Sequence, residues 1–309
     1  MTITAKIIKD STNPWGKRIT TWELEYPRLV HSEFMTHRQF SRNAASSRAI
    51  PIAKVIEQVK TNPAMPFKWG VNQAGMQAKE NVDSLTEESA IGVWLAARDS
   101  AVAHAQVLVD MGLHKQVVNR LLEPFQHIKV VLTTTEYANW KWLRLHTAAD
   151  PTTYELARVI DVAREESTPE QLKEGHWHLP YVHTEVINSI QYYFDDNGNE
   201  ISLEQAQKIS VSSCGQVSYR KLDTSLEKAE DIYQRLIESK PVHASPTEHQ
   251  AMVVDLEDEQ GYFRKGCTAI AAKDIDTDDD FEKASVIISG NFTGGWLQYR
   301  QMIPDNVKF

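Results

Sequence analysis

The chain has 309 residues, a net charge of −9 and 41% hydrophobic residues. This length is compatible with one large domain or two smaller ones, and the apolar content is sufficient for a sizeable core. The negative net charge argues against nonspecific binding to nucleic-acid polymers or to membrane surfaces. No apolar run approaches the roughly 18 residues of a membrane span, and the N-terminus lacks the apolar region of a signal peptide, so we expect a cytoplasmic protein.

The N-terminal part predicts a strand that leads into a strongly polar segment. Residues 20–35 alternate and then run apolar, and Pro27 breaks this pattern before a short helix. The segment from Thr36 to Arg48 then combines arginines, serines and an asparagine with almost no apolar residue, so it is not core. Because guanidinium groups suit phosphate oxygens, this segment indicates an anion-binding loop; the alternative is a solvated charged loop.

The rest of the chain mixes helices and strands. Two short extended pieces are expected around the Asp-Asn-Gly turn of residues 191–203. Helical spacing of apolar residues predicts helices after Pro51, at 87–111 with Gly112 as its C-cap, at 114–124, from Pro151 onward, and from Leu226 to Lys240.

Two further groups of residues carry candidate chemistry. The first is Arg120 together with Asn139 and Arg144, which lies in an aromatic, apolar stretch. An arginine in such a stretch is costly unless it is paired, although it could also extend over neighbouring tryptophans to reach solvent. The second is HASPTEHQA, residues 243–251, which follows the predicted helix from Leu226.

These groups resemble the flavin-dependent thymidylate synthase family, whose motif is Arg-His-Arg, a Ser, a spaced Asn, a second Ser and a closing Arg. The matching residues are His37, Arg38, Ser41, Asn43, Ser46 and Arg48. The chain departs from the motif at Thr36, Ala44 and Ala49. Asn139 and Arg144 fall on the family's Asn and on the Arg five residues later, and Arg120 falls on another nucleotide-binding Arg.

The order of the segments differs from that of the family. The His-x-Ser-Pro-x-Glu-His segment precedes the arginine motif in family members but follows it here. Residues 288–304 then look like a degenerate second copy of the lead-in to the motif. We interpret this as a circular permutation, with a motif-bearing half at 1–170, a connecting segment at 171–199 and a flavin-site half at 200–309.

The resemblance implies an α+β fold in which an antiparallel sheet packs with helices. It also implies methylation of deoxyuridine monophosphate (dUMP) to thymidylate, with FAD, NADPH and methylenetetrahydrofolate, in a homotetramer or dimer with shared active sites. Arg144 is the implied catalytic residue, and the implied substrate-binding residues are Glu33, Ser46, Arg48 and Arg120. The implied flavin-binding residues are His37, Arg38, Asn43, Asn139, Ser218, His243, Ser245 and Glu248.

Other functions stay open. A hydroxymethylated product or a cytosine substrate is an alternative, as is a non-catalytic nucleotide-binding protein. We expect no metal site, because His176 and His178 lack a third ligand, and Asp279 and Ser285 break a calcium-loop pattern. Cys214 and Cys267 lie far apart in the sequence and lack the spacing of a zinc site or a redox pair. We therefore expect both to be reduced thiols.

Overall fold

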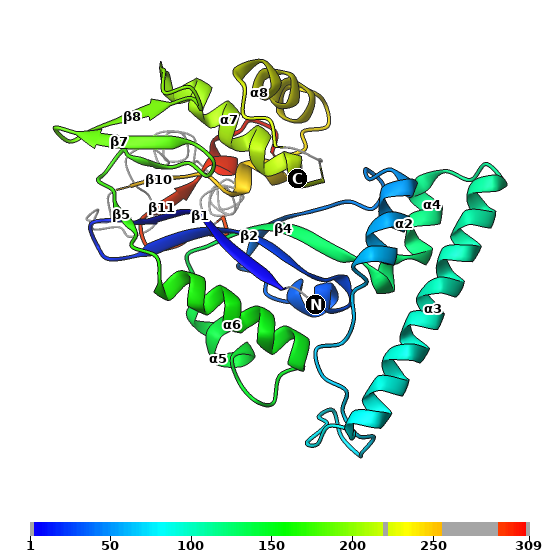
Figure 1. Cartoon of the computed structure of the whole chain (residues 1–309). Coiled ribbons are helices and arrows are strands. Elements are labelled where there is room, and N and C mark those ends of the chain that lie inside the picture. Colours follow the sequence, from blue (N-terminus) through cyan, green and yellow to red (C-terminus); the bar gives the residue numbers. More distant parts are fainter. Residues whose placement is uncertain (1–2, 219–221, 255–289, 307–309) are drawn as a thin grey trace, which may run out of the picture.

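The computed structural model describes residues 3–218, 222–254 and 290–306. Its mixture of helices and mainly antiparallel sheets confirms the predicted α+β class. A five-stranded sheet with the order β3-β4-β2-β1-β5 forms the centre (Figure 1). Its strands are β1 (Thr4–Thr12), β2 (Arg18–Pro27), β3 (Ser41–Ala44), β4 (His127–Thr134) and β5 (Glu170–Gln171), and only β1 and β5 pair in parallel.

Period-two alternation in β2 gives this sheet two different faces. Trp22, Leu24 and Tyr26 point to one face and are fully buried there. Helices α5 (Ala138–Arg144) and α6 (Pro151–Glu165) cover that face, as Figure 1 shows. The side chain of Asp150 caps the predicted helix by accepting from two backbone N–H groups at 2.9 Å, with Pro151 in the first turn.

The second half of the chain covers the opposite face of the sheet (Figure 1). It contains the sheet β11-β10-β6 and the sheet β7-β8-β9, in which β8 and β9 confirm the predicted extended pair. Their bounds are β6 (Trp177–His178), β7 (His183–Ile187), β8 (Ile190–Phe194), β9 (Glu200–Ile201), β10 (Ala251–Val253) and β11 (Trp296–Gln298). Helices α7 (Leu203–Gly215) and α8 (Leu226–Tyr233) pack against each other above them.

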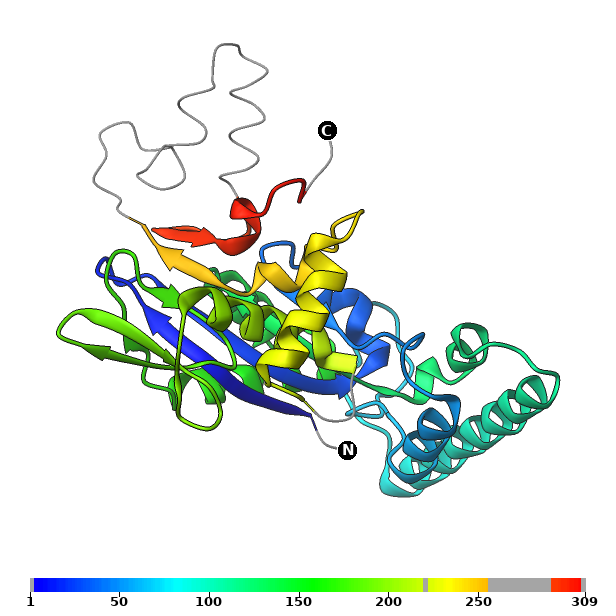
Figure 2. The same ribbon diagram turned by 90° about the horizontal axis from the view of Figure 1, so that it is seen from above.

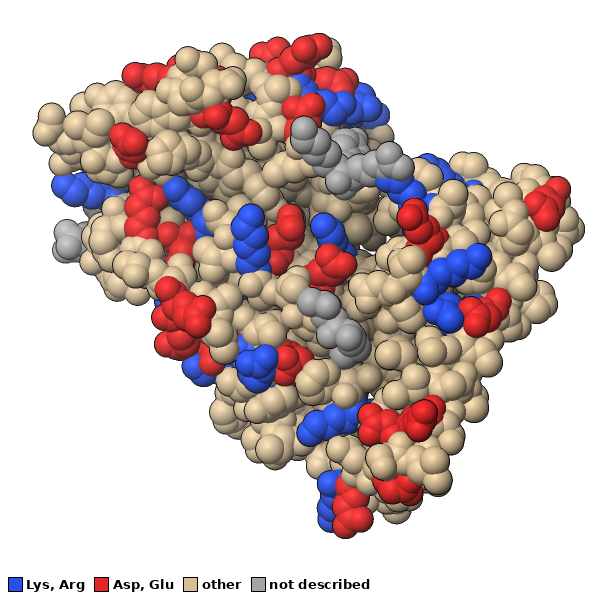
Figure 3. All heavy atoms as spheres, in the orientation of Figure 1, with Lys and Arg blue, Asp and Glu red and all other residues tan. Residues whose placement is uncertain are grey.

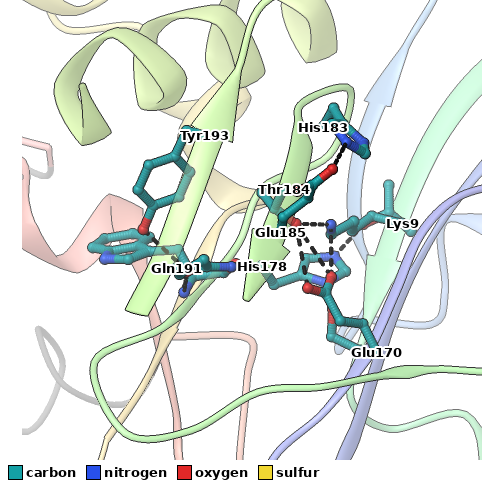
Figure 4. Close-up of polar contacts among 11 residues, drawn as sticks. Lys9, Glu170, His178, His183, Thr184, Glu185, Gln191 and Tyr193 are labelled. Atoms are coloured by element: carbon teal, nitrogen blue, oxygen red, sulfur yellow. Dashed lines mark hydrogen bonds and ion pairs between the residues drawn. The ribbon is translucent and has the colours of Figure 1, made fainter. Parts of the chain in front are cut away.

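Polar contacts join the two halves along a seam at β1 (Figure 4). Lys9 pairs with Glu170 at 2.8 Å and donates to Thr184 Oγ1 at 2.5 Å. Deeper in the seam, His178 lies between Ser11 Oγ and Thr21 Oγ1, each at 2.9 Å from one ring nitrogen. At this end, the polar face of the sheet is therefore buried and hydrogen-bonded rather than solvated.

Three helices form an arm that projects from the body of the molecule (Figure 2). They are α2 (Ile52–Thr61), α3 (Ser84–Asp110) and α4 (Lys115–Leu121), and they share a hydrophobic cluster of their own. With 27 residues, α3 is about 40 Å long. Gly112 has a φ of +81° just after α3, as the predicted C-cap requires.

The helix predicted from Leu226 to Lys240 is less regular than its pattern indicates. The α-helical part ends at Tyr233 and continues as a wider π-helical turn at Gln234–Glu238. Pro241 follows, and a proline disfavours helical backbone in the residue before it. A short α1 (His31–Phe34) follows Pro27, as the sequence predicts.

Lys and Arg side chains alternate with Asp and Glu over the face shown in Figure 3. Within the described part of the chain, no helix combines the length and the apolarity needed to cross a bilayer. The permuted segment order and the three-part division of the chain stay predictions. Cys267 and the acidic segment at 274–285 lie outside the described residues.

Candidate functional site

A pocket of about 330 Å³ lies where the arginine motif meets the end of β4. One wall is the loop that precedes β3, and the other is α5 together with Glu136, two residues before it. The lining residues are Thr36, His37, Arg38, Gln39, Phe40, Glu136, Asn139, Trp140, Leu143 and Arg144. The structure therefore brings together four of the predicted site residues, namely His37, Arg38, Asn139 and Arg144.

Aromatic packing holds the two walls together. Trp140 on α5 is buried against Phe34 and Phe40, with ring centroids 5.3 and 5.5 Å apart. Phe34 and Phe40 lie on either side of the motif loop, so their burial fixes both ends of that loop. The polar residues between them consequently remain at the surface of the pocket.

His37 and Arg144 form a polar contact between the two walls of this pocket. Arg144 Nε donates a hydrogen bond to His37 Nε2 at 3.0 Å. Burial, and then the nearby positive charges of Arg144 and Arg42, lower the pKa of His37 to about 4. His37 is therefore neutral at physiological pH and acts as an acceptor.

The pocket has more positive charge than its own carboxylate can balance. Among the residues that the structure describes, Arg38 and Arg144 have no carboxylate at ion-pair distance. Glu136 also lines the pocket, but Lys17 pairs with it and the Thr293 hydroxyl donates to it. Burial opposes ionisation of Glu136, yet these two partners give it a lowered pKa. The pocket thus favours an anionic or electron-rich ligand.

The predicted phosphate-binding residues lie at the other end of β3. The Ser46 N–H donates to Ser218 Oγ at 2.8 Å, while Arg48 is exposed. Arg120 is 64% exposed and lies 4.0 Å from Glu123. A four-residue strand spans about 13 Å. Within a single chain, these residues therefore lie away from the pocket.

Glu33 lies outside both places. It is exposed on α1, where the neighbouring Ser32 hydroxyl donates to its carboxylate at 3.1 Å. It does not line the pocket.

The predicted segment at 243–251 packs directly against the motif strand. Its 3₁₀ turn, η5 (Ser245–Glu248), contacts β3 although the two are about 200 residues apart in sequence. His243 and Ser245 are exposed at the surface of this turn. Asn43 is buried and donates to the Cys214 carbonyl at 3.2 Å, so it fastens β3 to α7.

The C-terminal segment supplies residues that the sequence did not assign to the site. Gln298 Nε2 donates to Ser41 Oγ and to the Glu248 carbonyl, both at 2.9 Å. Arg300 forms an ion pair with the Glu248 carboxylate. These contacts bridge β3 and η5. Gln298 and Arg300 stand beside the aromatic Tyr299, which was a signal, but the sequence could not show what they contact.

His176 and His178 turn toward different partners. The Nε2 of His176 bonds to the Ser189 carbonyl at 3.0 Å, whereas His178 lies in the seam. Over the described ranges, no three His, Cys, Asp or Glu side chains are grouped as metal ligands would be.

Comparisons with known proteins give limited similarity. No family model matches the sequence, and no curated protein has a significantly similar sequence. Among solved structures, the UMP/dUMP methylase PolB from Streptomyces cacaoi bound with 5-Br dUMP has a TM-score of 0.44 and 13% identity, covering 53% of this chain and 90% of its own. The same enzyme with 5-Br UMP gives 0.43 and 14%, with coverages of 53% and 89%. Similarity at this level establishes neither the family nor the function.

Proposed function

We propose that the protein is a flavin-dependent enzyme that methylates dUMP at ring carbon 5, with methylenetetrahydrofolate as carbon donor and NADPH as reductant. The observation that carries this proposal is the pair of unbalanced guanidinium groups, Arg38 and Arg144, in one pocket. The motif resemblance selects these two residues independently of the structure, from segments about 100 residues apart.

Arg144 has the central role in the proposal. A guanidinium stays protonated at every physiological pH, and Arg144 lines the pocket without a carboxylate partner among the described residues. It would stabilise the negative charge that develops on the pyrimidine carbonyl. Such preorganised stabilisation is most effective where the charge is not already neutralised by protein.

The flavin-binding assignment divides into two kinds of residue. Arg38, Asn139, His243 and Ser245 are exposed, and their imidazole, hydroxyl, amide and guanidinium groups suit the phosphates and ring edges of FAD. Asn43, Ser218 and Glu248 bind protein groups instead and would hold β3 and η5 in place. His37, the eighth assigned residue, also binds a protein group, because its ring accepts from Arg144. A bound flavin would supply the redox chemistry, which no side chain of this chain can provide.

Ser46, Arg48 and Arg120 would bind the nucleotide phosphate, and Glu33 would be a further substrate-binding residue. Because these residues lie away from the pocket within one chain, we propose a homo-oligomer whose active sites combine residues of two subunits. The arm offers a surface for this association. On α3, Leu85, Val93 and Val107 are 74%, 72% and 54% exposed.

Mixing two inactive variants tests the shared site. Arg48→Ala and Arg144→Ala should each be inactive alone, but mixed and re-equilibrated oligomers should regain activity at sites that combine two intact residues. Light scattering should show an oligomer. A monomer, or mixtures with no more activity than the separate variants, would contradict the shared site.

The enzymatic assignment is tested by spectroscopy and turnover. The purified protein should bind added FAD and show a flavin absorbance band. NADPH oxidation should respond to dUMP, and the product should have the mass of thymidylate when methylenetetrahydrofolate is present. Failure to bind any flavin would instead favour a non-catalytic nucleotide-binding protein.

One observation supports an alternative product or base. Thr36 lines the pocket at the position where the family motif has its first arginine, and its hydroxyl donates to the Glu33 carbonyl at 2.7 Å. The pocket therefore has one cation fewer than the motif supplies. A hydroxymethylated product, or deoxycytidine monophosphate as substrate, would be identified by product mass and by comparing the two nucleotides.

A further inference from the structure

Arg144 enters the pocket with one edge of its guanidinium anchored and the other edge free. Its Nε donates to His37 Nε2 at 3.0 Å. Among the described residues, nothing accepts a hydrogen bond from its two terminal Nη nitrogens. Paired N–H groups of arginine suit planar oxygen acceptors. The free Nη edge is therefore available to a ligand.

The ring of His37 is itself held in place. Its edge meets Trp140 with ring centroids 4.6 Å apart at an interplanar angle of 80°. Its backbone carbonyl accepts a hydrogen bond from Arg42 Nη1 at 3.0 Å. The imidazole acceptor is consequently a fixed point on the motif loop, to which the longer Arg144 side chain is attached.

The charges around His37 keep this acceptor unprotonated. Arg38, Arg42 and Arg144 are the cations near the ring, and Glu136 across the pocket is already engaged by Lys17. An imidazolium at this position would be repelled and would lose the ability to accept from Arg144 Nε. The tautomer that fits has its proton on Nδ1.

We propose that His37 is a positioning residue, whose Nε2 anchors Arg144 so that the Nη edge faces the pyrimidine of the bound nucleotide. The inference rests on the proposed function, because it takes the ring carbonyl of the nucleotide as the ligand of the Nη edge. Without the anchor, the arginine samples many rotamers and loses its preorganisation. His37 then affects recognition of the base but not of the phosphate.

Two substitutions separate this role from a general packing role. His37→Phe keeps an aromatic ring against Trp140 but removes the acceptor. His37→Gln places an amide oxygen close to the position of Nε2 and restores the acceptor. The control is His183→Phe, in which the same change is made at an exposed histidine that contacts Glu185 on strand β7.

The measurement is the dissociation constant of the FAD-loaded full chain for dUMP and for deoxyribose 5-phosphate, which lacks the base, by calorimetry. We expect His37→Phe to weaken dUMP binding by about tenfold. His37→Gln and His183→Phe should stay within about threefold of the parent protein. Binding of deoxyribose 5-phosphate should not change in any variant.

Several results would overturn the inference. They are unchanged dUMP binding by His37→Phe, equal weakening by the Gln and Phe variants, or parallel losses for both ligands. If His37→Phe does not fold, ¹⁵N NMR of the unaltered protein decides, because a proton on His37 Nε2 at pH 7 excludes the anchor. If the unaltered protein does not bind dUMP, the proposed function itself fails.

Discussion

The pocket at β3 and the seam on the polar face of the sheet use similar residues for opposite purposes. In the seam, Lys9 pairs with Glu170 and donates to the Thr184 hydroxyl. In the pocket, Arg38 and Arg144 have no such partner among the described residues. Paired charges are already neutralised within the closed seam, whereas unpaired charges in an open pocket are available to a ligand.

The histidines show the same contrast. His178 and His249 are fully buried, and each bonds to a threonine hydroxyl of the sheet at 2.9 Å. His37 bonds instead to an arginine at the pocket surface. All three have lowered pKa values because burial disfavours the imidazolium, but only His37 is also near a group proposed to contact substrate.

The largest effect is expected from Arg144→Ala. Removal of the guanidinium should lower kcat by at least about 100-fold, because preorganised charge stabilisation is lost. The melting temperature should stay near that of the parent protein, since Arg144 is at the end of α5 and lines an open pocket. Arg158→Ala, which removes an exposed ion pair with Glu155, is the control. Retained turnover would contradict the assignment of Arg144.

The buried histidines predict that stability falls in mild acid. Burial lowers the pKa of His249 to about 3 and that of His178 well below its ordinary value. The unfolded chain, with histidine pKa values near 6.5, therefore binds more protons below that pH. Between pH 7.5 and 5.5 each histidine should reduce the free energy of unfolding by roughly 1 kcal/mol.

Urea unfolding at both pH values checks this expectation. The Nε2 of His249 has no hydrogen-bond partner among the described residues, so nothing there compensates an imidazolium. His249→Asn should therefore reduce the difference between the two pH values. A chain equally stable at pH 7.5 and 5.5 would show that these histidines are not buried as described.

An effect of similar size is expected from Thr133→Val in the seam. The Thr133 hydroxyl bonds to Thr21 Oγ1 at 2.7 Å and to His249 Nδ1 at 2.9 Å. Valine has a similar shape but leaves both partners short of a hydrogen bond, at a cost of about 2 kcal/mol in the free energy of unfolding. Thr61→Val at the exposed end of α2 should change it little. Equal losses of unfolding free energy in the two variants would show that the buried hydroxyl in the seam stabilises the fold no more than the exposed one does.

The smallest effect concerns the bridge made by Gln298. Gln298→Ala should reduce the free energy of unfolding by about 1 kcal/mol and weaken FAD binding, because Ser41 and the Glu248 carbonyl lose their shared donor. Gln106→Ala on exposed α3 is the matched control. Unchanged FAD affinity would show that the bridge supports the fold without contributing to the site.

Much of the local structure could be predicted from the sequence. The helices at 87–111 and from Pro151 have apolar residues at helical spacing and clear caps, and the structure contains both. The helix from Leu226 was predicted too long, since periodicity does not reveal a π-helical turn. Motif spacing also selected His37 and Arg144, which do lie in one pocket, whereas Arg48 and Arg120 lie elsewhere.

By itself, the sequence determined the alternation of β2, which gives the sheet one apolar and one polar face. Alternation is local, because it depends only on the pleat of the strand. What covers the polar face was decided by the tertiary structure, which buries Thr21 under His178. The same holds for the contact of η5 with β3. Such pairings join residues far apart in sequence, and no local pattern specifies which surfaces meet.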